Sequence, residues 1–354
     1  MIIEVQDQLR HYSLENGEAY AVALTAKGTV ETARVIHHLS PTNTAAVGRL
    51  MMGALLTASD IKAENGDVTC AIDGGGPAGK VLAVASPKGT VRAAIENPEA
   101  DLPIRQTDGK LDVSGILGHA GRLTVVKDNG GREPYIGQTQ LKTGEVAEDF
   151  AYYFTLSEQR PCLIFTGVTV DRDASVKSAG AMAVFPLPGC REDVLQQLEQ
   201  RATGCGLLSF MLSEGMTLED AVQSIFSGMR MELTQTVPVC YQCNCSREKM
   251  ERALISIGEK DLREIIEEDH QAEIVCHARR QRQMCIRDRN KGARRSNRCK
   301  SHYGSKAIKY YPLHRSLPFT QKTDNGMRTG ENWPWPFKII VRPSIERRTI
   351  SNIN

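Results

Sequence analysis

Apolar and polar residues alternate along most of residues 19–187, which predicts a strand-rich region. In the segment AYAVALTAKGTVETARV, Lys27-Gly28 interrupts the alternation, and we interpret this pair as the turn of a β-hairpin. The segment SPTNTAAVGRLMMGALLTASDIK breaks the pattern, since Ser40 or Thr42 can cap it and its apolar residues recur at helical spacing. These apolar residues are Ala46, Leu50, Ala54, Leu55 and Ala58. We therefore expect an α+β body over residues 1–189, in which a long helix packs on a sheet.

Helical periodicity replaces the alternation after the sequence FPLPG. The segments CREDVLQQLEQRA and TLEDAVQSIFSGM both have helical spacing, and Thr217 with Asp220 forms an approximate capping box for the second. We expect a helical linker over residues 190–236.

Residues 237–277 form a small third segment. Ser246 caps the helical sequence SREKMERALISI, Gly258 ends it, and DLREIIEED is typical of another helix. The sequence AEIVC is typical of a short strand that delivers Cys276. A segment of this size has too little core to fold alone, so it needs a cross-link such as a bound metal.

Residues 278–354 differ in composition from the rest of the chain. They have neither helical nor strand periodicity, and we expect a disordered tail without a packed fold. They contain 19 Lys or Arg against 4 Asp or Glu, a net charge of +15, whereas residues 1–277 have a net charge of −13. The overall charge of +2 therefore hides two different kinds of chain.

The composition bounds the class of protein. A chain of 354 residues, 41% hydrophobic, can bury an ordinary core and is most naturally two or more domains. No apolar run approaches the roughly 18 residues of a membrane span, and the start MIIEVQDQ lacks the basic region of a signal peptide. We expect a soluble, cytoplasmic protein that does not bind membranes.

The segment GGGPAGK has the spacing of a phosphate-binding loop in Gly74, Gly79 and Lys80, so an ATPase is one alternative. Val81 stands where that motif has a magnesium-binding Ser or Thr, and VLAVAS continues as a strand instead of a helix. A tight turn between two strands is the favoured interpretation. Ser157 lacks a nucleophile elbow, and we expect the pair His37-His38 at the surface or at a strand end, so the sequence predicts no enzyme.

The cysteines give a stronger signal. Four of the ten lie between residues 240 and 276, which favours metal or redox chemistry over structural disulfides. Cys243 and Cys245 form a C-x-C pair, and Cys276 follows at a distance that a helical hairpin can close. Thiolates select zinc, and a closed tetrahedral thiolate site is structural or redox-active. The alternative is a coincidence among buried cysteines.

Several longer segments resemble the redox-regulated heat shock protein 33 family of chaperones over residues 1–277. They include TNTAAVGRLMMGALL, GPAGKVLAVASPKGTVRAAIENP, LTVVKDNGGREPYIGQTQLKTGEVAEDFAYYFTLSEQRP and CNCSREKMERAL. In this family a C-x-C pair and a C-x-x-C pair hold one zinc ion. Cys243, Cys245 and Cys276 match that pattern, whereas Arg279 stands in place of the fourth cysteine.

The mismatch at Arg279 coincides with the change of charge and composition. The string MCIRDR moreover resembles translated sequencing-adapter DNA. We interpret residues 278–354 as the product of a frameshift or an assembly artefact. Cys240 is the best substitute ligand because CYQC is itself a C-x-x-C spacing, and His277 and Cys285 are further candidates.

The resemblance implies an ATP-independent holdase that binds unfolding client proteins. It implies that zinc keeps the small domain folded in the reduced state, and that hypochlorous acid, or peroxide with heat, forms disulfides and expels the metal. It also implies that the linker then loosens and exposes apolar surface, and that the active protein is a homodimer. A nucleic-acid-binding protein acting through the basic tail is the alternative from another class.

Overall fold

The computed structural model describes residues 6–131 and 133–243, together with Ala278 and the backbone of five strands after residue 270. The chain divides into two compact units, Met1–Cys243 and Asn244–Asn354, which are described one at a time.

The first unit contains two sheets. The first sheet is antiparallel, with the strand order β10-β1-β2-β9-β8. Its strands are β1 (Gln8–Leu14), β2 (Ala19–Thr25), β8 (Leu163–Val170), β9 (Val176–Pro186) and β10 (Met231–Pro238), and the short helix η1 (Glu15–Gly17) joins β1 to β2. The second sheet has the order β11-β5-β4-β3-β6-β7 and is antiparallel except at β11, which runs parallel to β5. Its strands are β3 (Asp67–Asp73), β4 (Val81–Ala85), β5 (Thr90–Ile95), β6 (Arg122–Asp128), β7 (Tyr135–Gln140) and β11 (Cys240–Tyr241).

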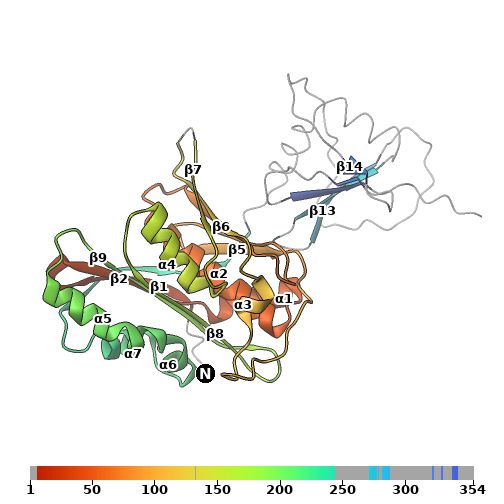
Figure 1. The fold of residues 1–354 in the computed structure, drawn as a ribbon. Helices are drawn as coiled ribbons and strands as arrows, with labels where there is room; N and C mark the ends of the chain where they lie inside the picture. The colour runs from red at the N-terminus through yellow and green to blue at the C-terminus, as the bar shows by residue number, and fades with distance from the viewer. Residues whose placement is uncertain are drawn as a thin grey trace, which may run out of the picture. The chain divides into compact units, whose positions relative to one another are not determined.

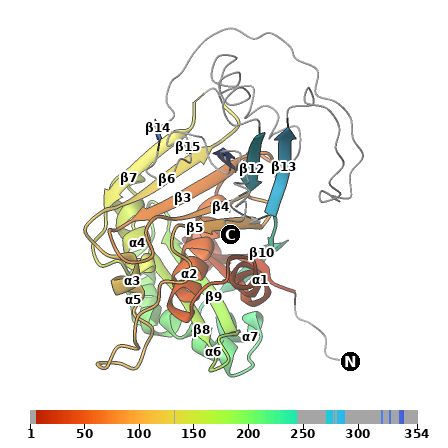
Figure 2. The same ribbon diagram turned by 90° about the vertical axis from the view of Figure 1, so that its right-hand side faces the viewer.

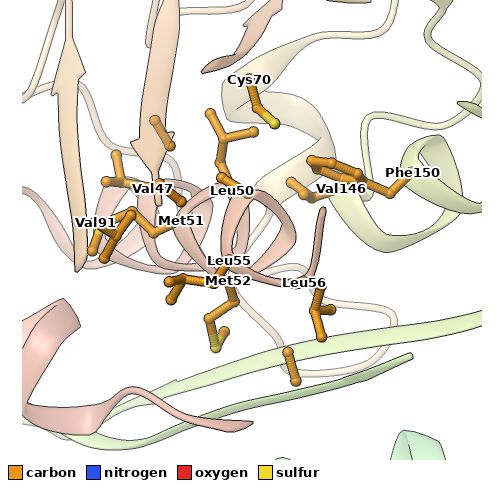
Figure 3. Close-up of a cluster of buried hydrophobic side chains, with 14 of the residues drawn as sticks. Val47, Leu50, Met51, Met52, Leu55, Leu56, Cys70, Val91, Val146 and Phe150 are labelled. Atoms are coloured by element: carbon orange, nitrogen blue, oxygen red, sulfur yellow. The ribbon is translucent and has the colours of Figure 1, made fainter. Parts of the chain in front are cut away.

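A central helix, α2 (Pro41–Ala58), lies between the two sheets (Figure 2). Ser40 caps it by accepting a hydrogen bond from the backbone N–H of Asn43, as its sequence predicts. Sixteen of its eighteen residues are buried, so the helix is covered on all sides and not along one stripe (Figure 3). The prediction of an α+β body with a long packed helix is therefore confirmed. The shorter helices α1 (Lys27–His37), α3 (Val113–Leu117) and α4 (Val146–Ser157) surround α2.

The predicted hairpin turn at Lys27-Gly28 is wrong, because these residues begin helix α1. The carboxylate of Asp7 accepts hydrogen bonds from the backbone N–H of Thr29 at 2.7 Å and from its hydroxyl at 2.8 Å. A side chain more than twenty residues away in the sequence thus satisfies the first turn of the helix, which no local pattern reveals. His37 is buried at the end of α1, so the predicted surface position is wrong for this residue, whereas His38 is exposed as predicted and caps the helix in the left-handed conformation.

Three helices follow the body: α5 (Glu192–Gly206), α6 (Leu208–Ser213) and α7 (Leu218–Ile225). The hydroxyl of Thr217 accepts a hydrogen bond from the N–H of Asp220, which confirms the predicted cap of α7. Figure 1 shows the three helices together on one side of the first sheet. The end of the predicted helical linker differs, since residues from Met231 onward form strand β10, whose partner β1 lies at the start of the chain.

In the second unit, β12 (Gln271–Cys276) pairs with β13 (Gln281–Arg287) and β16 (Phe337–Val341), and β15 (Arg328–Thr329) joins β16 to β14 (Gln321–Lys322). Strand β12 confirms the predicted strand that ends at Cys276. Strands β13 to β16 lie beyond residue 278, where the sequence analysis expects no regular structure. Strands β12 and β16 pair across some sixty residues, and a local sequence pattern does not reveal such distant pairing. The helices predicted between Ser246 and Asp269 lie outside the described residues.

Candidate functional site

The predicted redox cysteines are divided between the two units. Cys243 is the last described residue of the first unit and is buried, whereas Cys240 is exposed. Cys276 ends strand β12, Cys285 lies in β13, and their side chains are outside the described set. Cys245, His277 and Arg279 lie wholly outside the described residues.

The predicted ligands are of the type that zinc prefers, but they are fewer than the four that a closed site needs. Cys243, Cys245 and Cys276 supply three soft thiolates, and the arginine at position 279 is no ligand. Within the described residues, no group of three or more His, Cys, Asp or Glu side chains gathers in a way that could hold a metal ion. Cys240 is exposed three residues before Cys243, so its thiol is accessible to an ion there.

The segment directly before Cys243 pairs with the second sheet of the body. In strand β11, the N–H of Cys240 donates to the carbonyl of Gly89 at 3.1 Å, and the N–H of Gln242 donates to that of Val91 at 2.9 Å. The hydroxyl of Tyr241 lies 3.0 Å from Nε2 of His37. The residues directly before Cys243 are therefore fixed by main-chain and side-chain bonds to the second sheet and to α1.

The linker helices cover the face of the first sheet that points away from α2. Residues alternate between the two faces along a strand, so Ala19, Ala21 and Ala23 of β2 face the linker, while Val22 and Leu24 face the central core. The linker contributes a separate apolar cluster: Val194, Leu198, Cys205, Leu208, Leu218, Ala221, Val222, Ile225, Phe226 and Met229. This cluster is distinct from the one around α2, so the linker can separate without opening the central core.

Strand β10, at the end of the linker, is held by its pairing with β1, whereas the linker helices make mainly surface ion pairs with the body and one part-buried hydrogen bond, from the Ser178 hydroxyl to the carbonyl of Ser209 at 2.9 Å. Arg191 pairs with Glu18 at 2.6 Å, and the backbone hydrogen bond from Arg191 is the main reason that the pKa of Glu18 is lowered. Arg10 pairs with Glu219 at 3.0 Å. Exposed ion pairs of this kind contribute little to stability. The apolar layer is thus the main interaction that holds helices α5, α6 and α7 on the sheet.

Exposed apolar side chains gather around α6. Phe210 is 60% exposed, and Leu207 and Met216 are also exposed. If the linker separated from the sheet, its buried cluster would be added to this exposed apolar surface.

The turn GGGPAGK joins β3 to β4, as the sequence predicts, and four of its backbone N–H groups donate hydrogen bonds within the protein. The N–H of Gly76 donates to Leu117, that of Gly79 to Gly76, and that of Lys80 to the Glu96 carboxylate at 2.9 Å. A phosphate-binding loop needs such groups pointed at its ligand. The glycine at 74 is explained by packing, since a Cβ there would overlap the backbone of Leu117 and Gly118.

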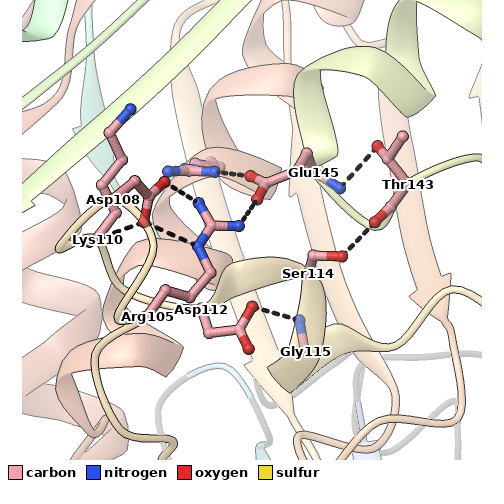
Figure 4. Close-up of polar contacts among 9 residues, drawn as sticks. Arg105, Asp108, Lys110, Asp112, Ser114, Gly115, Thr143 and Glu145 are labelled. Carbon is pink, nitrogen blue, oxygen red and sulfur yellow. Dashed lines mark hydrogen bonds and ion pairs between the residues drawn. The ribbon is translucent and has the colours of Figure 1, made fainter.

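A second charged cluster surrounds Glu145 at the start of α4 (Figure 4). Its carboxylate binds Arg49 at 2.5 Å and Arg105 at 2.8 Å, and Arg105 also pairs with Asp108. Each carboxylate is paired with an arginine, so this network joins the loop before α3 to the start of α4 and to α2.

Two cysteines of the body and one of the linker are poor nucleophiles. Burial raises the pKa of Cys162 and of Cys205 to about 12, and it also raises that of Cys70. A buried thiol with a raised pKa carries little thiolate at neutral pH. Burial also raises the pKa of the half-buried Cys190, so these four thiols are less reactive than a free cysteine.

The comparisons agree with this architecture. A family model described as Hsp33 protein matches residues 7–282. A 33 kDa chaperonin of Clostridium tetani (strain Massachusetts / E88) is 40% identical over 270 residues, which cover 76% of this chain and 92% of the relative. A 33 kDa chaperonin of Clostridium perfringens (strain 13 / Type A) is 41% identical over 273 residues, covering 77% and 86%. The crystal structure of a 33 kDa chaperonin (heat shock protein 33 homolog) from Thermotoga maritima matches with a TM-score of 0.70 at 31% identity, covering 80% of this chain and 95% of that chain.

Two sheets around a central helix, followed by a cysteine-bearing segment, thus define a protein with the fold of the 33 kDa chaperonins. The chain belongs to the Hsp33 family. The resemblance seen in its motifs is confirmed, and the family match ends at residue 282, so most of the basic tail lies beyond it. None of the helices in the described parts is long and apolar enough to span a membrane.

Three residues near the redox cysteines make contacts that the sequence did not predict: Tyr241, His37 and Gly89. Tyr241 and His37 are 204 positions apart, so no spacing connects them. The pair Lys88-Gly89 is a sequence signal for a turn, but it does not reveal that the carbonyl of Gly89 accepts a hydrogen bond from Cys240.

Proposed function

We propose that this protein is a redox-regulated, ATP-independent holdase that binds unfolding proteins in the cytoplasm. The observation that carries the proposal is the second apolar cluster, which the linker helices bury apart from the central core. Membership of the Hsp33 family supports a chaperone function.

The switch begins at the C-x-C pair. Peroxide oxidises the thiols of Cys243 and Cys245, which lose two electrons and two protons; a sulfur–sulfur bond forms between them and peroxide is reduced to two water molecules. Cys276 lacks a partner at position 279, so it stays a thiol, pairs with Cys240 or Cys285, or is oxidised further to a sulfinic acid.

Oxidation of Cys243 and Cys245 affects the linker helices through the residues that connect them. Strands β11 and β10 connect Cys243 to the last linker helix, and a disulfide at 243–245 changes the geometry where β11 ends. Helices α5, α6 and α7 bury an apolar cluster separate from the central core, so they can open as a unit of their own. Release then uncovers the linker cluster and the sheet face of Tyr12, Ala21 and Met182 for clients.

Zinc, when bound, would hold the thiolates of Cys243, Cys245 and Cys276 deprotonated and close together. With three thiolates where the family has four, the small domain gains less folding free energy from metal binding. We therefore propose that the chain as written is partly unfolded at rest and already active as a holdase under reducing conditions.

The fourth ligand provides the test of this resting state. Arg279→Cys, in a chain whose tail is replaced by an in-frame family end, should make activity depend on oxidant. The measurement is light scattering of a heat-unfolded client, with and without reductant, for both chains. A chain as written that is silent when reduced and fully active with peroxide would show that the fourth ligand is dispensable.

The holdase itself is tested without nucleotide, and suppression of client aggregation at a stoichiometric ratio is the expected result. Deletion of residues 278–354 should leave that suppression intact. Loss of activity on deletion would favour a nucleic-acid-binding protein that acts through the +15 tail. We further propose that the oxidised protein is a homodimer, which sedimentation of oxidised and reduced samples checks.

A further inference from the structure

The edge of strand β5 is occupied by a segment of the same chain. Residues 239–242 lie along it in an extended conformation, and Cys240 and Tyr241 pair with Thr90 and Val91 in parallel register. Two hydrogen bonds to the carbonyls of Gly89 and Val91 hold the segment by its main chain. This is how an extended peptide adds to a sheet edge, where main-chain bonds give affinity for any sequence.

One side chain adds specificity to this contact. The hydroxyl of Tyr241 lies 3.0 Å from Nε2 of the buried His37 and 3.3 Å from both the backbone N and O of Ala93. The two rings meet edge to face, at 68° between their planes. An aromatic ring with a hydroxyl satisfies these polar atoms, whereas an aliphatic side chain has no group that can.

We infer that the β5 edge is a binding site for an extended peptide carrying a tyrosine, and that residues 239–242 occupy it in cis. An extended segment of an unfolding client takes their place when the switch segment is released. The site rests on the proposed holdase function, for which it supplies a specific contact surface. A covalently attached segment has a high effective concentration, so a client gains access only after that segment leaves.

Gly89 offers a way to displace the segment without touching the switch cysteines. It has a φ of +79°, and a Cβ there would overlap the carbonyl oxygen of Pro238, just before β11. Gly75 has a φ of +77°, and a Cβ there would meet nothing within 4 Å. Gly89→Ala and Gly75→Ala therefore impose similar backbone strain, and only the first displaces residues 238–242.

The probe is a peptide with the sequence of residues 239–244, serine replacing both cysteines, with a free N-terminus and fluorescein at its C-terminal end, so that no carbonyl takes the place of that of Pro238. Its binding to the full chain in reductant is measured by anisotropy. We expect Gly89→Ala to bind it about tenfold tighter than Gly75→Ala and the parent chain, because the cis competitor is displaced. Peptides with phenylalanine and alanine in place of the tyrosine should bind progressively more weakly. Equal binding by the two glycine variants, or equal binding of the tyrosine and alanine peptides, would overturn the inference.

A second variant covers the case in which Gly89→Ala does not fold. Tyr241→Phe removes only the hydroxyl, and it should also raise peptide affinity above that of the parent chain; no increase would overturn the inference. Client aggregation with the same variants separates this site from the proposed function. A chain that suppresses aggregation without binding the peptide contradicts the site alone, whereas peptide binding without suppression supports the site and contradicts the holdase.

Discussion

The hydroxyl of Tyr241 lies 3.0 Å from Nε2 of His37, which joins the approach to the redox cysteines to the end of helix α1. Because His37 is buried, this contact makes residues up to Cys243 part of the body's packing. A change at Cys243 therefore acts on a segment that the body already holds. The consequences can be tested at the linker, at the buried thiols, at the glycine turn and at Cys240.

Leu198→Ser should release the linker. Leu198 is buried in the linker cluster, and the loss of such a side chain costs about 2–5 kcal/mol. We expect more suppression of client aggregation in reductant than the parent chain gives, and a smaller further gain with peroxide, both followed by light scattering. The control Phe210→Ser changes an exposed side chain and should alter stability by less than about 0.5 kcal/mol. A Leu198→Ser protein that is only less stable, with unchanged activity, would contradict the linker mechanism.

Cys205 should report linker release through its reaction with N-ethylmaleimide. Its pKa of about 12 in the packed state leaves a thiolate fraction of about 10⁻⁴ at pH 8, and release returns the pKa to about 8.5. In the Arg279→Cys chain with an in-frame family end, peroxide treatment should therefore accelerate alkylation of Cys205 by two or more orders of magnitude, as measured by mass spectrometry after denaturing quench, whereas Cys205 of the chain as written should already react quickly in reductant. Cys70 lies in the central core with a raised pKa, and it should stay protected. Equal acceleration at both thiols would mean that the whole body opens.

Lys80→Ala should leave client binding unchanged, and we expect ATP hydrolysis from neither the variant nor the parent chain. Four N–H groups of the glycine turn donate hydrogen bonds within the protein, and a phosphate would have to break those hydrogen bonds to bind there. Lys88→Ala, an exposed lysine in the next turn, is the matched control. ATP hydrolysis that disappears with Lys80→Ala alone would identify an ATPase and contradict the holdase proposal.

Cys240→Ser should weaken zinc binding if Cys240 replaces the missing fourth ligand. Its exposed thiol lies three residues before Cys243, whereas Cys190 lies at the start of the linker. We expect a loss of affinity of about tenfold or more for Cys240→Ser and none for Cys190→Ser, measured by competition with a chromogenic chelator. If both variants bind zinc with the same affinity, Cys240 takes no part in the site.

The local pattern of the sequence determined those features whose causes are local. The cap of α2 at Ser40, the cap of α7 at Thr217 and the turn between β3 and β4 depend on contacts within a few residues, and each was predicted correctly. The spacing of Cys243, Cys245 and Cys276 is likewise readable without coordinates, and with the longer motifs it identified the family.

Tertiary structure decided the features whose partners are distant in the chain. Helix α1 replaced a hairpin because Asp7 caps it, and β10 replaced a helix because β1 pairs with it. The contact of Tyr241 with His37 and the approach of Pro238 to Gly89 likewise join the last residues of the first unit to distant parts of the chain. Hydrophobic periodicity reports which face of an element is buried and not what covers it, so the cover of the β5 edge became visible only in the folded chain.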